Sequence, residues 1–262
     1  MAGFRARTTD PVDLGVVPYP AVTMAINLSD GPFTVDDVGG LRQESSVVIG
    51  LAPSGVRGRG REIECLQVRL SPVVAHAVLG VSSEWEGAVV RLDDLWNRDA
   101  ARMYEQLRAA RSWDDRFAVA ETALVRRLGE GPAVEPEIAF AWGRMVRSRG
   151  GLRIERLAAE TGWSRKRLWS RFRARVGITP KRAAQLVRFD HAAHRLAAGH
   201  SAARVAAEIG YVDQSHLHRD VRAFAGMTPA AVAMEPWLAV DDVAWAAPAY
   251  LSGKHFYKTP GS

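Results

Sequence analysis

The chain has 262 residues, of which 47% are hydrophobic and 24% are charged, and its formal net charge is +6. This composition excludes an intrinsically disordered chain and fits one large domain or two modest ones. The sequence has no apolar run long enough to span a membrane and no apolar segment after its basic N-terminus that would form a secretory signal, so we expect a cytoplasmic protein.

The N-terminal third shows the spacing of short strands. Apolar runs at 21–28, 45–53 and 63–70 are separated by segments rich in glycine, proline and serine. The segment 55–62, GVRGRGRE, is expected to form a hairpin turn, because it lacks the strand-to-helix setting of a phosphate-binding loop. These features predict a small β-rich domain.

The pattern becomes helical after about residue 92. Apolar residues recur at helical spacing in 97–110 and 113–130, with few helix breakers. Acidic pairs at 93–94 and 114–115 resemble paired catalytic carboxylates, but each pair begins a helix. Because the helix dipole favours acidic residues in the first turn, we interpret both pairs as structural.

A segment rich in glycine and proline at 129–137 is the clearest domain boundary. We expect a sensing or dimerisation domain at 1–130 that is first β-rich and then helical. A helical domain is expected at 131–235, followed by a tail at 236–262 that shows no clear periodicity.

Basic charge is concentrated in one part of the chain. Residues 151–234 contain 15 Arg and Lys against 6 Asp and Glu, a local net charge of +9, whereas the remainder carries −3. A basic segment of this kind attracts nucleic acid or an anionic membrane, and it is also compatible with an ordinary solvated surface. Charge alone does not separate these possibilities.

The helical region contains an internal repeat. The sequence LAAETG at 157–162 returns as VAAEIG 48 residues later, at 205–210, and the two copies extend over 154–180 and 202–229. One extra residue in the turn of the second copy lengthens the offset to 49 in the segment that follows. Each copy reads as a short helix, a turn that contains glycine, and a second helix.

The apolar residues of the repeat define a buried helix face. In the first copy, Leu168, Phe172 and Val176 lie four residues apart and so share one face of a helix. Leu217 and Val221 occupy the matching places in the second copy. A glycine at each turn permits a positive φ, and a serine or aspartate stands before each second helix as an N-cap. This is the helix-turn-helix pattern.

The opposite face of each second helix carries groups that could read DNA. Hydrogen-bond donors of this kind contact base edges in a major groove and grip the phosphates beside it. The exposed set is Arg165, Lys166, Trp169, Ser170 and Arg173 in the first copy, and Gln214, Ser215, His218, Arg219 and Arg222 in the second. Two such faces within one basic segment favour DNA binding. Trp163 and Tyr211, which follow the turn glycines, are expected to pack against the next helix instead.

Residues 180–199 predict a helix that connects the two copies, with Leu186 and Phe189 on its apolar face. About 18 helical residues span roughly 27 Å, which is close to the ~34 Å of one turn of B-DNA. Such a connector could set two reading helices into successive major grooves. His191 and His194 on this helix are expected at a solvated surface or near phosphate rather than as metal ligands, and we expect no metal or cofactor.

Residues 136–234 resemble the DNA-binding domain of the AraC/XylS family of bacterial transcription regulators. The second copy is the more specific match, with Gly210, Tyr211, Gln214, Ser215, Leu217, Arg219, Arg222, Gly226, Thr228 and Pro229 at signature positions. Val221 departs from the family, which usually has phenylalanine there, and Phe224 could fill the space. The resemblance implies base contacts from Lys166, Arg167, Trp169 and Ser170 in the first copy, and from Gln214, Ser215, His218 and Arg219 in the second. Arg173 and Arg222 are expected to grip phosphate.

The N-terminal half resembles the compact β sensor domain of some family members, with a helix at 70–81 and a helical pair that starts at 92–96. We therefore expect an α+β protein: a small, β-rich, reduced barrel or cupin-like domain with helices, then an all-α domain of two helix-turn-helix subdomains joined by a linker helix. The resemblance implies a non-enzymatic regulator at promoters, with double-stranded DNA and RNA polymerase as partners. It also implies a small-molecule effector, homodimerisation, or both, through the N-terminal domain. The effector, the operator and the sign of regulation stay open.

The chain's single cysteine supports an alternative hypothesis. Cys65 lies in an apolar run and is expected to be a core thiol, since a lone cysteine excludes an internal disulfide. An enzyme or alkylation-repair protein tethered to DNA could instead use Cys65 as the alkyl acceptor. The surrounding IECLQV sequence has no nearby histidine, which counts against this role. A DNA-architectural protein with little sequence preference is a further possibility.

Overall fold

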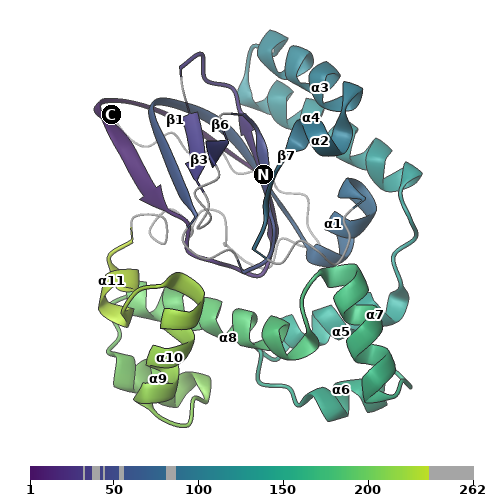
Figure 1. Ribbon diagram of the computed structural model, residues 1–262, viewed down its shortest axis with the longest axis vertical. Coiled ribbons are helices and arrows are strands. Elements are labelled where there is room, and N and C mark those ends of the chain that lie inside the picture. The colour runs from purple at the N-terminus through teal and green to yellow at the C-terminus, as the bar shows by residue number, and fades with distance from the viewer. Residues whose placement is uncertain (32, 37–41, 44, 53–55, 81–86, 236–262) are drawn as a thin grey trace.

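The computed structural model describes residues 1–235 except 32, 37–41, 44, 53–55 and 81–86. An antiparallel β-sheet with four helices forms the N-terminal half, and the C-terminal half is entirely helical (Figure 1). The predicted α+β class is therefore confirmed. The predicted tail at 236–262 lies outside the described residues.

The sheet is built around one long strand. Its strands are β1 (Ala2–Gly15), β2 (Val22–Asn27), β3 (Phe33–Asp36), β4 (Arg42–Gln43), β5 (Val47–Ile49), β6 (Arg57–Leu70) and β7 (Val89–Arg91). The order is β4-β3-β6-β2-β5-β7, and β1 pairs with β6. All of the described pairings are antiparallel. The central strand β6 therefore has β1 along one edge and both β2 and β3 along the other.

The hairpin turn expected at 55–62 is wrong, because the described part of this segment forms the first half of β6. Glycine and arginine alternate here with the period of two that is typical of a strand. A Cβ built on Gly58 would touch the ring of Phe33 at 3.7 Å. Arg59 pairs with the carboxylate of Asp36 at 2.9 Å. The glycines made this strand look like a turn, while pairing with β1 and β3 stabilises it.

The four helices of the N-terminal half lie where the sequence predicts them. They are α1 (Pro72–Leu79), α2 (Leu92–Trp96), α3 (Arg98–Ala109) and α4 (Trp113–Glu130). The acidic pairs at 93–94 and 114–115 stand in the first turns of α2 and α4, as expected from the helix dipole. Ser112 caps α4 by accepting a hydrogen bond from the backbone N–H of Asp115.

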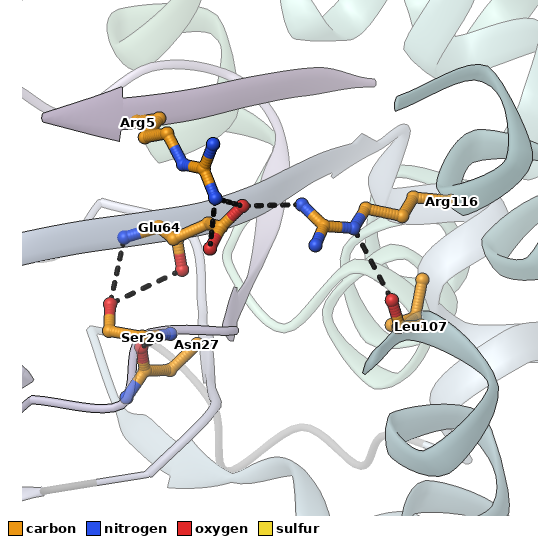
Figure 2. A network of polar contacts seen from close by, with 6 residues as sticks. All are labelled: Arg5, Asn27, Ser29, Glu64, Leu107 and Arg116. Atoms are coloured by element: carbon orange, nitrogen blue, oxygen red, sulfur yellow. Dashed lines mark hydrogen bonds and ion pairs between the residues drawn. The ribbon is translucent and has the colours of Figure 1, made fainter. Parts of the chain in front are cut away.

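A polar network joins the sheet to α3 and α4 (Figure 2). The carboxylate of Glu64, on β6, pairs with Arg116 of α4 at 2.6 Å and with Arg5 of β1 at 3.2 Å. Arg116 also donates to the carbonyl of Leu107 at 3.3 Å, and Ser29 hydrogen-bonds to the backbone of Glu64. The side chains of Arg116 and Glu64 are only 15% and 17% exposed, so loss of either partner would leave a largely buried charge.

Seven helices form the described part of the C-terminal half. They are α5 (Pro136–Arg147), α6 (Ile154–Glu160), α7 (Arg165–Val176), α8 (Pro180–Ala197), α9 (Ala202–Ile209), α10 (Gln214–Ala225) and α11 (Pro229–Ala233). Residues 131–135 of the segment rich in glycine and proline lie between α4 and α5. The long helix α8 runs from the α5–α7 group to the α9–α11 group (Figure 1).

Helix α1 connects the two halves of the protein. It directly follows β6 and packs against α4 on one side and against α5 and α7 on the other (Figure 1). Apolar residues of the sheet, of α1 and of the C-terminal helices belong to one continuous buried cluster. A change in the position of α1 would therefore displace its packing partners α5 and α7 in the first helix-turn-helix unit. Within the described ranges, no helix combines the length and apolar character needed to cross a membrane.

Candidate nucleic-acid interface

The two helix-turn-helix units use the same turn. Gly162 and Gly210 have φ values of +68° and +82°, a region that glycine adopts without strain. In each turn the next residue donates its backbone N–H to an alanine carbonyl at 3.0 Å, from Trp163 to Ala158 and from Tyr211 to Ala206. The extra residue of the second copy, Val212, is 86% exposed and leaves this bond unchanged. The turn geometry predicted from the repeat is confirmed.

N-capping side chains set the start of α7 and α10, the second helix of each unit, which we call the reading helices. Ser164 accepts a hydrogen bond from the backbone N–H of the third residue of α7, and Asp213 does the same at α10. Thr179 and Thr228 cap α8 and α11 in the same way, each before a proline at the first turn. The caps at Ser164 and Asp213 are those predicted from the sequence.

Buried apolar residues fix the rotation of the reading helices. Leu168 and Phe172 of α7 are fully buried, as are Leu217 and Val221 of α10. Phe224 is also buried and stacks on Phe189 of α8, with ring centroids 5.1 Å apart. Val221 is smaller than the phenylalanine usual at this position, and the aromatic contact in α10 is made instead by Phe224, one turn further along the helix. With these faces buried, the opposite faces of α7 and α10 point to solvent.

A buried ion pair adds to the contact between α8 and α10. Arg188 donates to Asp220 at 3.1 Å, and the two side chains are 18% and 10% exposed. The Arg188 guanidinium also lies 4.6 Å from the ring centroid of Tyr211. Tyr211 is buried and Trp163 packs against the core, so the prediction that both turn aromatics are packing residues is confirmed.

Each unit also contains a glutamate held between two arginines. Glu160 of α6 accepts hydrogen bonds from Arg144 of α5 at 2.7 Å and from Arg156 at 2.9 Å. The second unit repeats this arrangement around Glu208 of α9, with Arg195 of α8 at 2.5 Å and Arg204 at 2.7 Å. These contacts lower the pKa of both glutamates to about 2, chiefly through hydrogen bonds from Arg144 and from Arg204.

We refer to these two arrangements as the glutamate clamps. Sequence reasoning missed them, although both copies contain an arginine four residues before a glutamate, in RLAAE and RVAAE. The second arginine of each clamp comes from the preceding helix, α5 or α8. The repeating unit is therefore three helices, α5–α7 and α8–α10, rather than the two that the sequence repeat predicts.

The ten residues expected to contact DNA all lie exposed on the two reading helices. They are Lys166, Arg167, Trp169, Ser170 and Arg173 of α7, and Gln214, Ser215, His218, Arg219 and Arg222 of α10. Several are oriented by neighbours. The guanidinium of Arg167 lies over the ring of Trp163 at 4.7 Å, and that of Arg173 lies 5.5 Å from the ring centroid of Trp169. Two polar surfaces on related units are thus available to a ligand.

The connecting helix shows no sign of a metal site. The ring nitrogen Nδ1 of His194 lies 2.8 Å from the carbonyl oxygen of Asp190, one turn earlier in α8. The pKa of His191 is lowered, mainly by burial. Across the described parts of the chain, no group of three or more potential metal ligands comes together.

The environment of Cys65 does not suit a nucleophile. The side chain is buried on β6, and burial raises the pKa of its thiol to about 12. A reactive cysteine requires the thiolate, which this environment disfavours at neutral pH. The expectation of a core thiol is confirmed.

Comparison with known proteins identifies the C-terminal region. Residues 157–234 match a protein family described as a helix-turn-helix domain. The chain carries an AraC-type helix-turn-helix domain. A helix-turn-helix domain binds DNA, and this match supports the predicted DNA-binding regulator over the DNA-tethered enzyme. No curated protein matches the sequence.

Solved structures resemble this chain over most of its length. One is ToxT from Vibrio cholerae O395, with 12% sequence identity and a TM-score of 0.50 over 89% of this chain and 96% of that one. Another is ToxT from the same source bound to (E)-4-(8-methylnaphthalen-1-yl)but-3-enoic acid, again with 12% identity and a TM-score of 0.50, covering 89% and 97% of the two chains. At this identity the likeness shows the fold alone: an N-terminal β-sheet domain followed by helices.

Proposed function

We propose that this regulator recognises a specific promoter sequence by placing α7 and α10 in adjacent major grooves of double-stranded DNA. Base contacts come from Lys166, Arg167, Trp169 and Ser170 of α7, and from Gln214, Ser215, His218 and Arg219 of α10. Arg173 and Arg222 grip phosphate. The observation that carries this proposal is the exposure of all ten side chains on two equivalent helices.

The geometry of the connector supports reading by both units. Helix α8 has 18 residues, from Pro180 to Ala197, which corresponds to about 27 Å. Its apolar face is buried, and its ends belong to the two units, so it acts as a stiff spacer. One turn of B-DNA rises by about 34 Å, so both reading helices could enter the same face of one duplex.

We further propose that residues 1–130 form a domain that senses a small molecule, mediates homodimerisation, or does both, and that residues 131–235 form the DNA-binding domain. The route between them is a contact between α1 and α7. Arg175 of α7 donates to Nε2 of His76 on α1 at 2.8 Å and to Glu135 at 2.5 Å. Arg171 binds the same Glu135 carboxylate through two hydrogen bonds, of 2.7 and 3.0 Å.

The contact with His76 attaches α7 to the sensor half, whereas the contacts with Glu135 attach it to the start of α5. Burial disfavours ionisation of Glu135, but hydrogen bonds from Arg175 and Arg171 outweigh this effect and lower its pKa. A ligand that shifts β6 or α1 would therefore shift the first reading helix. The organic acid bound in one ToxT structure is a precedent for an effector in this fold. RNA polymerase is the expected protein partner at the promoter.

The base-reading and phosphate-binding roles can be separated by two variants of α10. Arg219→Ala should weaken binding to the operator by about 1–3 kcal/mol and relax the preference at one base pair. Arg222→Ala should weaken binding to all sequences alike. It should also reduce the magnitude of the slope of log K against log salt by about 1, as expected for the loss of one phosphate contact. Equal effects of both variants on operator and random DNA would contradict the assignment.

The operator itself can be found by selecting duplexes from a random pool with the full-length protein at near-physiological salt. Low salt would allow phosphate binding to mask base reading. We expect two unlike motifs about one helical turn apart, since the two reading faces differ. Recovery of one motif would refute reading by both units, and recovery of none in the presence or absence of candidate effectors would refute sequence-specific binding.

A further inference from the structure

Trp169 is an apolar side chain on a surface that is otherwise polar and basic. It is 46% exposed on α7, between its neighbours Lys166 and Arg173 on the same face. Its counterpart in the second unit, at the 49-residue offset, is His218, and the residue after it, Ser170, corresponds to Arg219. The first unit thus presents an indole and a hydroxyl where the second presents an imidazole and a guanidinium.

The indole has no place in the core of its own unit. Leu168 and Phe172, on the opposite face of α7, are fully buried and hold the rotation of the helix. The guanidinium of Arg173 lies 5.5 Å from the ring centroid of Trp169, so the ring is flanked by a cation and stays at the surface. Its apolar surface is therefore available to a ligand.

The surrounding charge selects the kind of ligand. A protein partner that covered Trp169 with an apolar surface would also have to desolvate Lys166 and Arg173, whereas DNA supplies base-edge acceptors for Lys166 and a phosphate for Arg173. In the major groove the apolar group available on base edges is the C5-methyl of thymine. Ser170 is small and leaves room for the ring to approach the bases.

We propose that Trp169 selects thymine in the half-site read by α7, through contact between its indole ring and the thymine C5-methyl group. Arg219 gives the second half-site a different preference, because a guanidinium suits the paired acceptors of guanine. The two half-sites are thus distinguished by chemistry, so the operator has a direction. This inference rests on the proposed entry of α7 into the major groove.

The test removes the methyl group without changing base pairing. Each thymine of the selected operator is replaced in turn by deoxyuracil, and the affinity of the full-length protein is measured. Loss of one buried methyl group should weaken binding about fourfold at the contacted position. The Trp169→Ala variant should bind operators with thymine or deoxyuracil at that position equally well, and its overall affinity should be lower than that of the wild type. Trp169→Phe should retain part of the preference for thymine.

Controls separate this inference from the proposed function. His218→Ala, altered at the equivalent position of α10, should keep the thymine preference in the α7 half-site. Equal affinity of the wild type for thymine and deoxyuracil throughout a two-part operator would overturn the role of Trp169 but leave the proposed function intact. If no α7 half-site appears in the selection or in a footprint, the proposed function has failed first. Because Trp169 is exposed, its variants should unfold at the same urea concentration as the wild type, and a lower midpoint would count against the inference.

Discussion

Replacement of Gly131 by alanine should push α1 away from the segment that joins α4 to α5. A Cβ at this position would lie 1.9 Å from the carbonyl oxygen of Ala77 and 2.8 Å from its carbonyl carbon. Both are backbone atoms, so no side-chain rotation relieves the overlap. The two segments must separate by at least about 1 Å, and overpacking of this kind typically costs about 1–3 kcal/mol. Ala77 is itself buried in α1, so the displacement reaches the neighbours of that helix.

The free energy of unfolding, measured by urea titration, should therefore fall by about 1–3 kcal/mol in Gly131→Ala. Gly129→Ala is the matched control, because it lies two residues earlier, in the last turn of α4, and its Cβ would meet nothing within 4 Å. Alanine in a helix is more favourable than glycine by up to about 1 kcal/mol, so this variant should be slightly more stable than the wild type. A wild-type urea midpoint for Gly131→Ala, or an equal loss in both variants, would refute the reasoning.

Two further predictions concern pH. The pKa of Cys65 is about 12 in the folded protein against an ordinary 9.0, so its contribution to stability is complete below pH 9 and is lost as pH rises toward 12. At pH 10 this loss is on the order of 1 kcal/mol, and urea titrations at pH 8 and 10 should show it in the wild type but not in Cys65→Ala, whereas parallel losses would contradict it. The clamp carboxylates Glu160 and Glu208 have pKa values lowered from 4.5 to about 2, so they stabilise the fold above pH 4.5 and cease to do so as pH falls toward 2. Glu160→Gln and Glu208→Gln should unfold at lower urea than wild type at pH 7, with the difference shrinking in acid, whereas Glu105→Gln, exposed on α3, should behave as wild type throughout.

The features that could be predicted from the sequence are those set by local periodicity. The spacing of Leu168 and Phe172 fixes the buried face of α7, and capping residues such as Ser164 mark where helices begin. The helix-turn-helix units and the position of their exposed faces therefore follow from neighbouring residues alone. The first half of β6 was misread because its alternating glycines suit a turn, and only pairing with other strands decides in favour of a strand.

Contacts between distant segments could not be predicted in this way. His76 and Arg175 are 99 residues apart, and nothing in either local sequence indicates that α1 meets α7. The glutamate clamps depend in the same way on the packing of α5 against α6 and of α8 against α9. Sequence periodicity finds the elements and their faces, whereas the attachment of one element to another is decided by the packing of the whole core.

The separation of the clamps from the reading faces has a consequence for how such a protein could acquire new targets. Within this one chain the two three-helix units share the clamp, the turn and the caps, yet the residues on their reading faces differ. Folding of each unit is carried by one set of side chains, and in the proposed function sequence preference is carried by another. If α7 and α10 read DNA as proposed, substitutions on the exposed face of either helix should change the preference at one half-site without unfolding the unit and without altering the other half-site. Duplication of such a unit would then give one chain two DNA-contacting helices whose sequence preferences can change independently.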